Sequence, residues 1–134
     1  MRRIKSDNDG KTTHCVVFDI DETLIYLDGT IIKPILDVYN FARNNGYNIS
    51  IITARTGTVN VIRYTIDQLR RLNIKRYDSM FFRPTQHHDP LRFKEMSRKQ
   101  VTDDGLVIVM SIGDSNWDIG KYGGKGVIVP RKTY

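Results

Sequence analysis

The sequence has few of the features that mark secreted or membrane proteins. It contains one cysteine, Cys15, so no disulfide can form within the chain, and the expected role is a small buried core residue. No segment approaches the roughly 18 consecutive apolar residues that a membrane-spanning helix needs. The first dozen residues are polar and charged, with no apolar stretch behind them, unlike a signal peptide. We therefore expect a cytoplasmic protein with no membrane contact.

Length and composition favour one compact domain. The chain has 134 residues, of which 40% are hydrophobic, which is enough for a substantial core. Residues 1–12 lack apolar periodicity and are expected to form a flexible basic tail before a domain at 13–134. The formal net charge of +6 invites a polyanionic partner, but net charge bears on association more than on chemistry.

A pair of carboxylates closes the first apolar run. Val16, Val17 and Phe18 have the β-branched and aromatic character of a buried strand, and Asp19 and Asp21 follow them. If the extended conformation persists, the two acids point to the same side. Their repulsion requires a cation or a shared proton, unless the pair is purely structural. The pattern favours a metal-assisted site with an aspartate nucleophile.

Strand-like and helix-like segments alternate along the rest of the chain. The expected strands are 14–20, 48–53, 79–82, 106–112 and 126–129. The expected helices are 34–45, 58–72 and 91–101, with a hairpin flap at 24–32 and a helical turn at 119–122. Alternation of this kind predicts an α/β fold with a mainly parallel five-stranded sheet covered by helices on both faces.

Polar side chains follow three of these strands at the same edge. Ligands of such sheets bind at the carboxyl ends of the strands, where the strand order reverses. Residues distant in sequence are therefore expected to meet there: Asp19, Asp21, Thr53, Arg55, Asp114 and Asp118.

Four short motifs in this order resemble those of the haloacid-dehalogenase (HAD) superfamily. Asp19-Ile20-Asp21-Glu22-Thr23 resembles its first motif, D-x-D-x-T, and Thr53 stands where the second motif has Ser or Thr. Lys94 stands where a basic third motif is expected, and residues 113–118, Gly-Asp-Ser-Asn-Trp-Asp, match the fourth form, G-D-x-x-x-D. The resemblance implies a single Rossmann-like domain.

The first motif has a clear chemical use in phosphoryl transfer. Asp19 would attack phosphorus and form an aspartyl-phosphate, which is a recognised covalent route. Asp21 would protonate the leaving oxygen and then activate water. As the resemblance implies, Mg²⁺ would be held by Asp19, the backbone carbonyl of Asp21 and Asp114, with Asp118 acting directly or through water.

Phosphate oxygens would be bound by Thr53 and Lys94, with Arg55 as a further candidate. Lys94 has competitors on the same expected helix: Arg92, Arg98 and Lys99. Taken alone, Thr53 reads as a strand-end hydroxyl, Lys94 as a solvated helix residue and Arg55 as an exposed loop residue. Their order relative to the acids is what indicates a site.

The intervals between the motifs leave no room for a cap domain. The chain therefore resembles the capless, acid-phosphatase-like members, a Mg²⁺-dependent phosphomonoesterase being the leading hypothesis. An open site also suits a polynucleotide end, such as a 3′-phosphate, and a homo-oligomer partner could cover it. A non-catalytic binding or regulatory protein on the same fold is the alternative from another class, and a transferase or mutase sharing the intermediate stays open.

Two further motifs are interpreted as coincidental. Asp28-Gly29-Thr30 resembles part of a first motif, but Tyr26 stands in the place of the leading aspartate, so a hairpin turn is expected. His87-His88-Asp89 hints at a transition-metal site. Adjacent histidines rarely chelate one ion unaided, and no cysteine or third histidine is nearby, so contact with substrate from this loop is favoured over metal binding.

Overall fold

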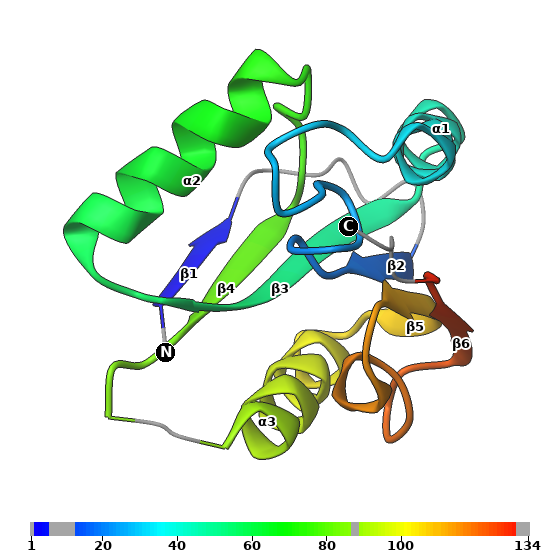
Figure 1. The fold of residues 1–134 in the computed structure, drawn as a ribbon. Coiled ribbons are helices and arrows are strands. Elements are labelled where there is room, and N and C mark those ends of the chain that lie inside the picture. Colours follow the sequence, from blue (N-terminus) through cyan, green and yellow to red (C-terminus); the bar gives the residue numbers. More distant parts are fainter. Residues whose placement is uncertain (1, 6–12, 87–88, 131–134) are drawn as a thin grey trace.

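Figure 1 shows a computed structural model in which one sheet lies between helices. The structure describes residues 2–5, 13–86 and 89–130. The strands are β1 (Arg2–Lys5), β2 (His14–Phe18), β3 (Asn48–Thr56), β4 (Ser79–Arg83), β5 (Val107–Gly113) and β6 (Lys125–Ile128). The helices are α1 (Lys33–Asn44), α2 (Val59–Arg71), α3 (Pro90–Asp103) and the short 3-10 helix η1 (Asn116–Asp118).

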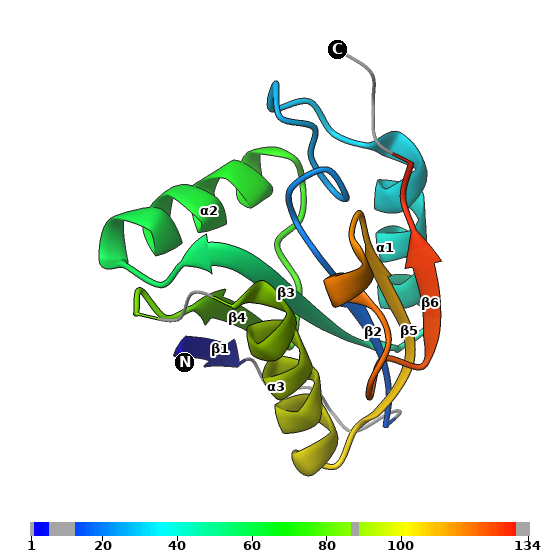
Figure 2. The ribbon, with the colours of Figure 1, turned by 60° about the horizontal axis from the view of Figure 1, so that its bottom comes forward.

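The sheet has the order β1-β4-β3-β2-β5-β6. Strands β2 to β6 are parallel to one another, which confirms the expected five-stranded parallel sheet. Figure 2 shows β1 and β6 at its two edges. The chain adds β3 and β4 on one side of β2, then β5 and β6 on the other. The strand order therefore reverses at β2, which places a ligand crevice at the carboxyl end of that strand.

Alternate side chains of β2 pack in two separate hydrophobic clusters. Val16 and Phe18 pack in the larger cluster with α1 and α2, while Cys15 and Val17 pack in the smaller cluster with α3. This is the two-residue period of an extended strand buried on both faces. Figure 1 accordingly shows α1 and α2 on one side of the sheet and α3 on the other.

Local sequence explains the helix boundaries. Pro34 lies in the first turn of α1, where its missing N–H costs no hydrogen bond. The Thr58 hydroxyl caps α2 by accepting from the Val61 amide, and Asp89 caps α3 by accepting from the Arg92 amide. Val59, the first residue of α2, is 60% exposed.

The amino terminus differs from the expected tail. Arg2–Lys5 forms β1, which pairs antiparallel with β4 at the edge of the sheet. Its residues show no apolar alternation, so only the availability of an unpaired neighbouring strand explains the pairing. The rest of the expected tail, residues 6–12, lies outside the described residues.

One expected local structure is present in a short form and another is misplaced. The arms of the flap are joined by the antiparallel bridge between Ile25 and Ile31 and by backbone hydrogen bonds from Tyr26 to Thr30 and from Ile32 to Leu24, and Gly29 (φ 88°) lies in the expected turn. The helical turn expected at 119–122 is wrong, since the single turn after β5 is η1 at Asn116–Asp118. The helices of the described ranges are all too short or too polar to cross a membrane.

Candidate active site

The chain leaves the sheet immediately after β2, at Asp19. The Asp19 amide still donates to the carbonyl of Ile112 in β5, at 2.9 Å, but strand geometry ends at Phe18. The amides of Thr23, Leu24 and Ile25 then all donate to the carbonyl of Ile20, so the backbone turns sharply. The expectation that Asp19 and Asp21 share one side of an extended strand is therefore wrong.

Gly113 leaves space for the side chain of Asp118 in the turn after β5. A Cβ atom at position 113 would lie 2.1 Å from the Cβ of Asp118, so only glycine leaves room for that side chain. Oδ2 of Asp118 accepts from the amides of Asp114 and Ser115, each at 3.1 Å. This local capping fixes the direction of the Asp118 carboxylate.

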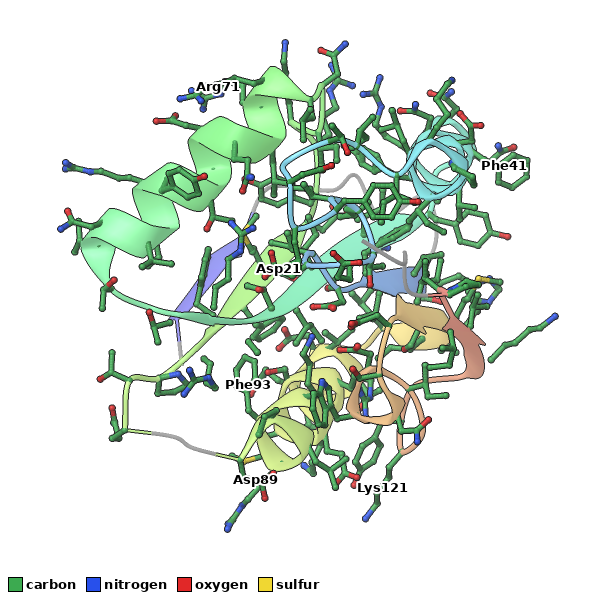
Figure 3. All side chains as sticks on the ribbon, in the orientation of Figure 1. Asp21, Phe41, Arg71, Asp89, Phe93 and Lys121 are labelled. Carbon is green, nitrogen blue, oxygen red and sulfur yellow. The ribbon has the colours of Figure 1, made fainter. Side chains whose placement is uncertain are left out.

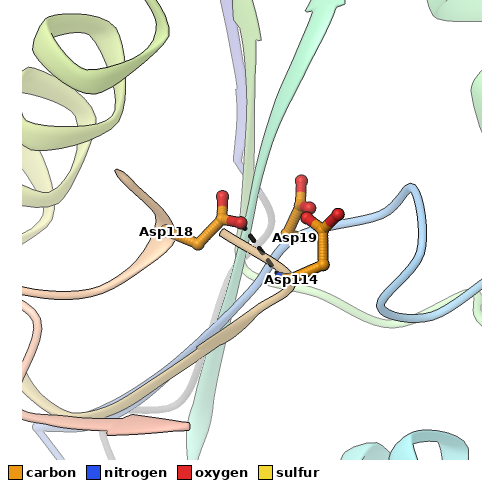
Figure 4. Close-up of side chains that lie close together, drawn as sticks. All are labelled: Asp19, Asp114 and Asp118. Carbon is orange, nitrogen blue, oxygen red and sulfur yellow. Dashed lines mark hydrogen bonds between the residues drawn. The ribbon is translucent and has the colours of Figure 1, made fainter. Parts of the chain in front are cut away.

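The structure brings together three acids from the ends of β2 and β5. One carboxylate oxygen from each of Asp19, Asp114 and Asp118 lies within 4.8 Å of the other two. Figure 4 shows these three side chains close together. Asp19 and Asp118 are buried and Asp114 is half-buried. We call these three residues the acidic cluster.

Lys94 enters the acidic cluster from α3. Its Nζ lies 2.8 Å from Oδ1 of Asp19 and 2.7 Å from Oδ1 of Asp118, and it also donates to the carbonyl of Ile52. Only 2% of the lysine is exposed. Of the four cations considered on this helix, Lys94 is the one that reaches the acids.

The electrostatics of the cluster follow from burial. The pKa of Asp19 is raised to about 7, because burial, which the ammonium of Lys94 opposes and the neighbouring Asp118 reinforces, disfavours the charged form. Burial would lower the pKa of Lys94, but Asp19 and Asp118 more than compensate and raise it. One ammonium cannot neutralise three carboxylates, so the cluster attracts a further cation.

The acidic cluster fits a divalent metal ion. The nearest cation to the buried Oδ1 of Asp118 is the ammonium of Lys94, at 2.7 Å, which Asp118 shares with Asp19. A buried carboxylate is costly unless it is paired, and one ammonium shared by the cluster leaves negative charge that a metal ion would offset. Carboxylate oxygens are the ligands that Mg²⁺ prefers.

Asp21 does not join the acidic cluster. Its side chain is 48% exposed and accepts two hydrogen bonds from Arg55, from Nε to Oδ2 at 3.0 Å and from Nη2 to Oδ1 at 2.7 Å. Arg55 Nη1 also donates to Thr65 and Gln68 of α2. Asp21, labelled in Figure 3, is thereby linked to the end of β3 and to α2.

Thr53 lies deeper than expected. β3 continues to Thr56, so Thr53 lies within the strand, is fully buried, and accepts from the amide of Arg55 at 3.1 Å. Its neighbour Ala54 lines the pocket at the acidic cluster.

An open pocket of about 310 Å³ lies over the acidic cluster. It is lined by Asp19, Asp21, Glu22, Leu27, Ala54, Lys94, Asp114, Ser115 and Trp117. Sequence reasoning did not identify Leu27 and Trp117, which are 73% and 40% exposed. Trp117 lies between Asp114 and Asp118, which was the available signal; nothing in the sequence singles out Leu27.

The family of the chain is decided by the sequence of residues 27–134. This segment matches the family Acid_phosphat_B, described as HAD superfamily, subfamily IIIB (Acid phosphatase). The chain belongs to the HAD superfamily. The matched family is described as one of acid phosphatases, which agrees with the resemblance of the motifs. The matched segment includes Lys94, Asp114 and Asp118 and begins after Asp19 and Asp21.

Solved structures share the HAD fold of this chain. One chain in "Structure of Pnkp1/Rnl/Hen1 complex" has a TM-score of 0.79 over 97% of this chain, with 17% identity. Another, in "Structure of the Pnkp1/Rnl/Hen1 RNA repair complex", has a TM-score of 0.70 over 98%, also with 17% identity. The present chain spans 50% and 47% of those chains. Among curated proteins, none matches it.

Asp28 and Asp89, from the two motifs interpreted as coincidental, have local structural roles. The carboxylate of Asp28 accepts from the amide and hydroxyl of Thr30, which is the expected turn. Asp89 caps α3, whereas His87 and His88 lie outside the described residues.

A second hollow of about 480 Å³ lies between α1 and the segment after α2. It is lined by leucine, basic and amide side chains and by no carboxylate.

Proposed function

We propose that this chain is a Mg²⁺-dependent phosphomonoester hydrolase that works through an aspartyl-phosphate on Asp19. The observation that supports this proposal is the convergence of the acidic cluster and Lys94 at the reversal point of the sheet, where Asp19, Asp114 and Lys94 line one open pocket. When bound, Mg²⁺ supplies the positive charge that a phosphate group needs to approach a carboxylate. The acidic cluster would hold the ion.

In the first step, a carboxylate oxygen of Asp19 attacks phosphorus and the ester P–O bond breaks. Lys94, 2.8 Å from Asp19, favours the ionised form of that carboxylate and lies where it can bind a phosphate oxygen. Asp21, which is 48% exposed, takes up a proton from solvent and gives it to the leaving oxygen. In the second step, Asp21 takes a proton from water, the water oxygen attacks phosphorus, and phosphate leaves Asp19 as the anhydride P–O bond breaks.

The sequence suggests Arg55 as a further residue that binds phosphate oxygens. In the structure, its guanidinium is engaged by Asp21, Thr65 and Gln68. We therefore assign Arg55 to holding Asp21 at the pocket. Thr53 would contribute through the backbone around Arg55, since its hydroxyl accepts from the Arg55 amide.

Hydrolysis of an aryl phosphate tests the proposal. Wild-type protein should release product with MgCl₂ and lose activity in EDTA, and Asp19→Asn should be inactive while still folding. An acid-quenched reaction should contain protein phosphorylated at Asp19, visible by mass spectrometry, with a burst of product before steady state. Full activity of Asp19→Asn would contradict the proposal, and stable binding of phosphate compounds without turnover would favour the non-catalytic alternative.

A polynucleotide-end phosphatase is a second candidate. The open pocket has exposed apolar groups, Leu27 and Trp117, on which a terminal base could stack, and the net charge of +6 suits an anionic chain. The fold is shared with chains from RNA repair complexes, whose activity is not thereby assigned to this one.

Salt dependence separates the two substrate classes. A 3′-phosphorylated oligonucleotide contacted by several cations should lose affinity steeply between about 50 and 200 mM salt, whereas a small phosphomonoester should respond far less. Equal rates and equal salt slopes for an oligonucleotide and the corresponding nucleoside 3′-phosphate would favour the small substrate.

A further inference from the structure

Arg98 is a completely buried cation that the proposed reaction does not use. It lies on α3 one helical turn after Lys94, on the same buried face, and none of its surface is exposed. An arginine side chain stays charged in proteins and carries five N–H donors, so its burial requires acceptors with matching geometry.

Those acceptors are three backbone carbonyls in the segment that follows β5. Nη1 donates to Trp117 at 3.0 Å, Nη2 to Ile119 at 3.1 Å and Nε to Lys121 at 2.9 Å. We call residues 114–124 the acid loop. Because alternate carbonyls of the acid loop converge on one guanidinium, the loop backbone wraps around Arg98.

The position of these contacts links Arg98 to the acidic cluster. Trp117 and Ile119 are the immediate neighbours of Asp118, so the backbone is held on both sides of that carboxylate. Lys94 contacts the carboxylate itself, at 2.7 Å. Two cations one turn apart on α3 thus fix the backbone and the side chain of the same residue.

The far end of the acid loop is also fixed. The Ser111 hydroxyl of β5 donates to the carbonyl of Gly123 at 2.9 Å. Between this contact and the start of the loop, the Asp118 carboxylate is held by the amides of Asp114 and Ser115 and by Lys94. Arg98 adds three hydrogen bonds to the backbone from Trp117 to Lys121. Its loss would leave the other contacts in place and loosen the backbone on both sides of Asp118.

We propose that Arg98 is a positioning residue that sets the affinity of the acidic cluster for its divalent ion by fixing the acid loop. This inference rests on the proposed function only in taking Mg²⁺ as the ion. Removal of groups that orient metal ligands commonly weakens metal binding about 10- to 100-fold. A comparable loss is expected when Arg98 no longer holds the loop.

The chain provides its own probe of the loop, because Trp117 is its single tryptophan. Arg98→Met keeps an unbranched apolar stem without donors, and Arg98→Lys keeps the charge but cannot span three carbonyls. Acrylamide should quench Trp117 fluorescence more strongly in Arg98→Met than in wild type, with Arg98→Lys intermediate. The quenching of each variant is measured without metal and without substrate.

The matched control is Tyr39→Phe. The Tyr39 hydroxyl donates to the carbonyl of Arg76 and accepts from its amide, so the variant also loses buried hydrogen bonds to backbone, but between α1 and the segment before β4. It should lower the melting temperature and leave the quenching of Trp117 unchanged. A general loss of stability is thereby separated from a displaced acid loop.

Isothermal titration with MgCl₂ alone completes the test. The Kd should rise about 10- to 100-fold in Arg98→Met, less in Arg98→Lys, and stay at the wild-type value in Tyr39→Phe. Should Arg98→Met fail to fold, Arg98→Lys decides. Folded Arg98 variants with wild-type Kd overturn the inference, whatever the quenching shows, and leave the proposed function intact. Wild-type protein that does not bind Mg²⁺ overturns both.

Discussion

Lys94 Nζ lies 2.8 Å from Oδ1 of Asp19, although the two residues are 75 positions apart. Both side chains are more than nine-tenths buried, and the ammonium also contacts Asp118. A buried ion pair is stabilising only while both partners are present, because removal of one leaves an uncompensated charge. The stability of the fold and the chemistry of the pocket therefore depend on the same contact.

Replacement of Lys94 should destabilise the protein. Lys94→Met leaves Asp19 and Asp118 buried without their cation, which typically lowers the free energy of unfolding by about 3–5 kcal/mol. Urea denaturation at neutral pH in EDTA measures this loss, and MgCl₂ should restore part of it by supplying positive charge. The control is Lys99→Met on the same helix, whose exposed pair with Asp103 should contribute little. Equal stabilities for the two variants would contradict the proposed electrostatics.

Binding of Mg²⁺ should strengthen as pH rises. Because burial raises the pKa of Asp19 to about 7, the carboxyl holds a proton below that pH in the metal-free protein, and metal binding must release it. Affinity should therefore fall as much as about tenfold for each pH unit below 7 and level off above it. Titration calorimetry from about pH 5.5 to 8 checks this, and Asp19→Asn should remove the slope. If the affinity of Asp19→Asn for Mg²⁺ depends on pH as steeply as that of the wild type, the released proton comes from another group.

Cys15 should resist alkylation in the folded protein. Burial raises the pKa of its thiol to about 12, from an ordinary value of 9.0. The thiolate is the reactive form, and at pH 8 this shift lowers its fraction from about one tenth to about 10⁻⁴. Iodoacetamide labelling followed by mass spectrometry should be slow in buffer and fast in denaturant. Rapid labelling of the native protein would contradict the burial of β2 between two cores.

Much of the fold was predictable, because the composition of the strands and their order along the chain indicate which residues lie at the carboxyl edge of the sheet. Each parallel strand reads as a short apolar run, and an acid placed directly after such a run must emerge at the carboxyl edge of the sheet. Asp19 and Asp114 follow β2 and β5, which are neighbours, so their convergence required no detail of side-chain packing.

The details that were missed depend on contacts between distant segments. β1 pairs with β4 through backbone groups, which carry no residue pattern. The turn at Ile20 places Glu22 at φ 59° and redirects Asp21, and no residue type at these positions demands it. Lys94 and Arg98 are buried because they lie on the side of α3 that faces the sheet. The spacing of basic residues along the sequence does not by itself predict which side of the helix that is.

The hydrogen bonds from Arg55 to Asp21 predict how replacement of Arg55 changes the kinetics. If Arg55 holds Asp21 at the pocket, Arg55→Ala should lower kcat by about 10²-fold, the usual effect of a misplaced catalytic group, and leave the KM for an aryl phosphate almost unchanged. A direct phosphate contact would instead raise KM and weaken inhibition by inorganic phosphate. Steady-state kinetics of Arg55→Ala, Asp21→Asn and the double variant separate the two roles. Because the residues would act as one unit, the double variant should be no slower than Asp21→Asn alone, whereas additive losses would return Arg55 to phosphate binding.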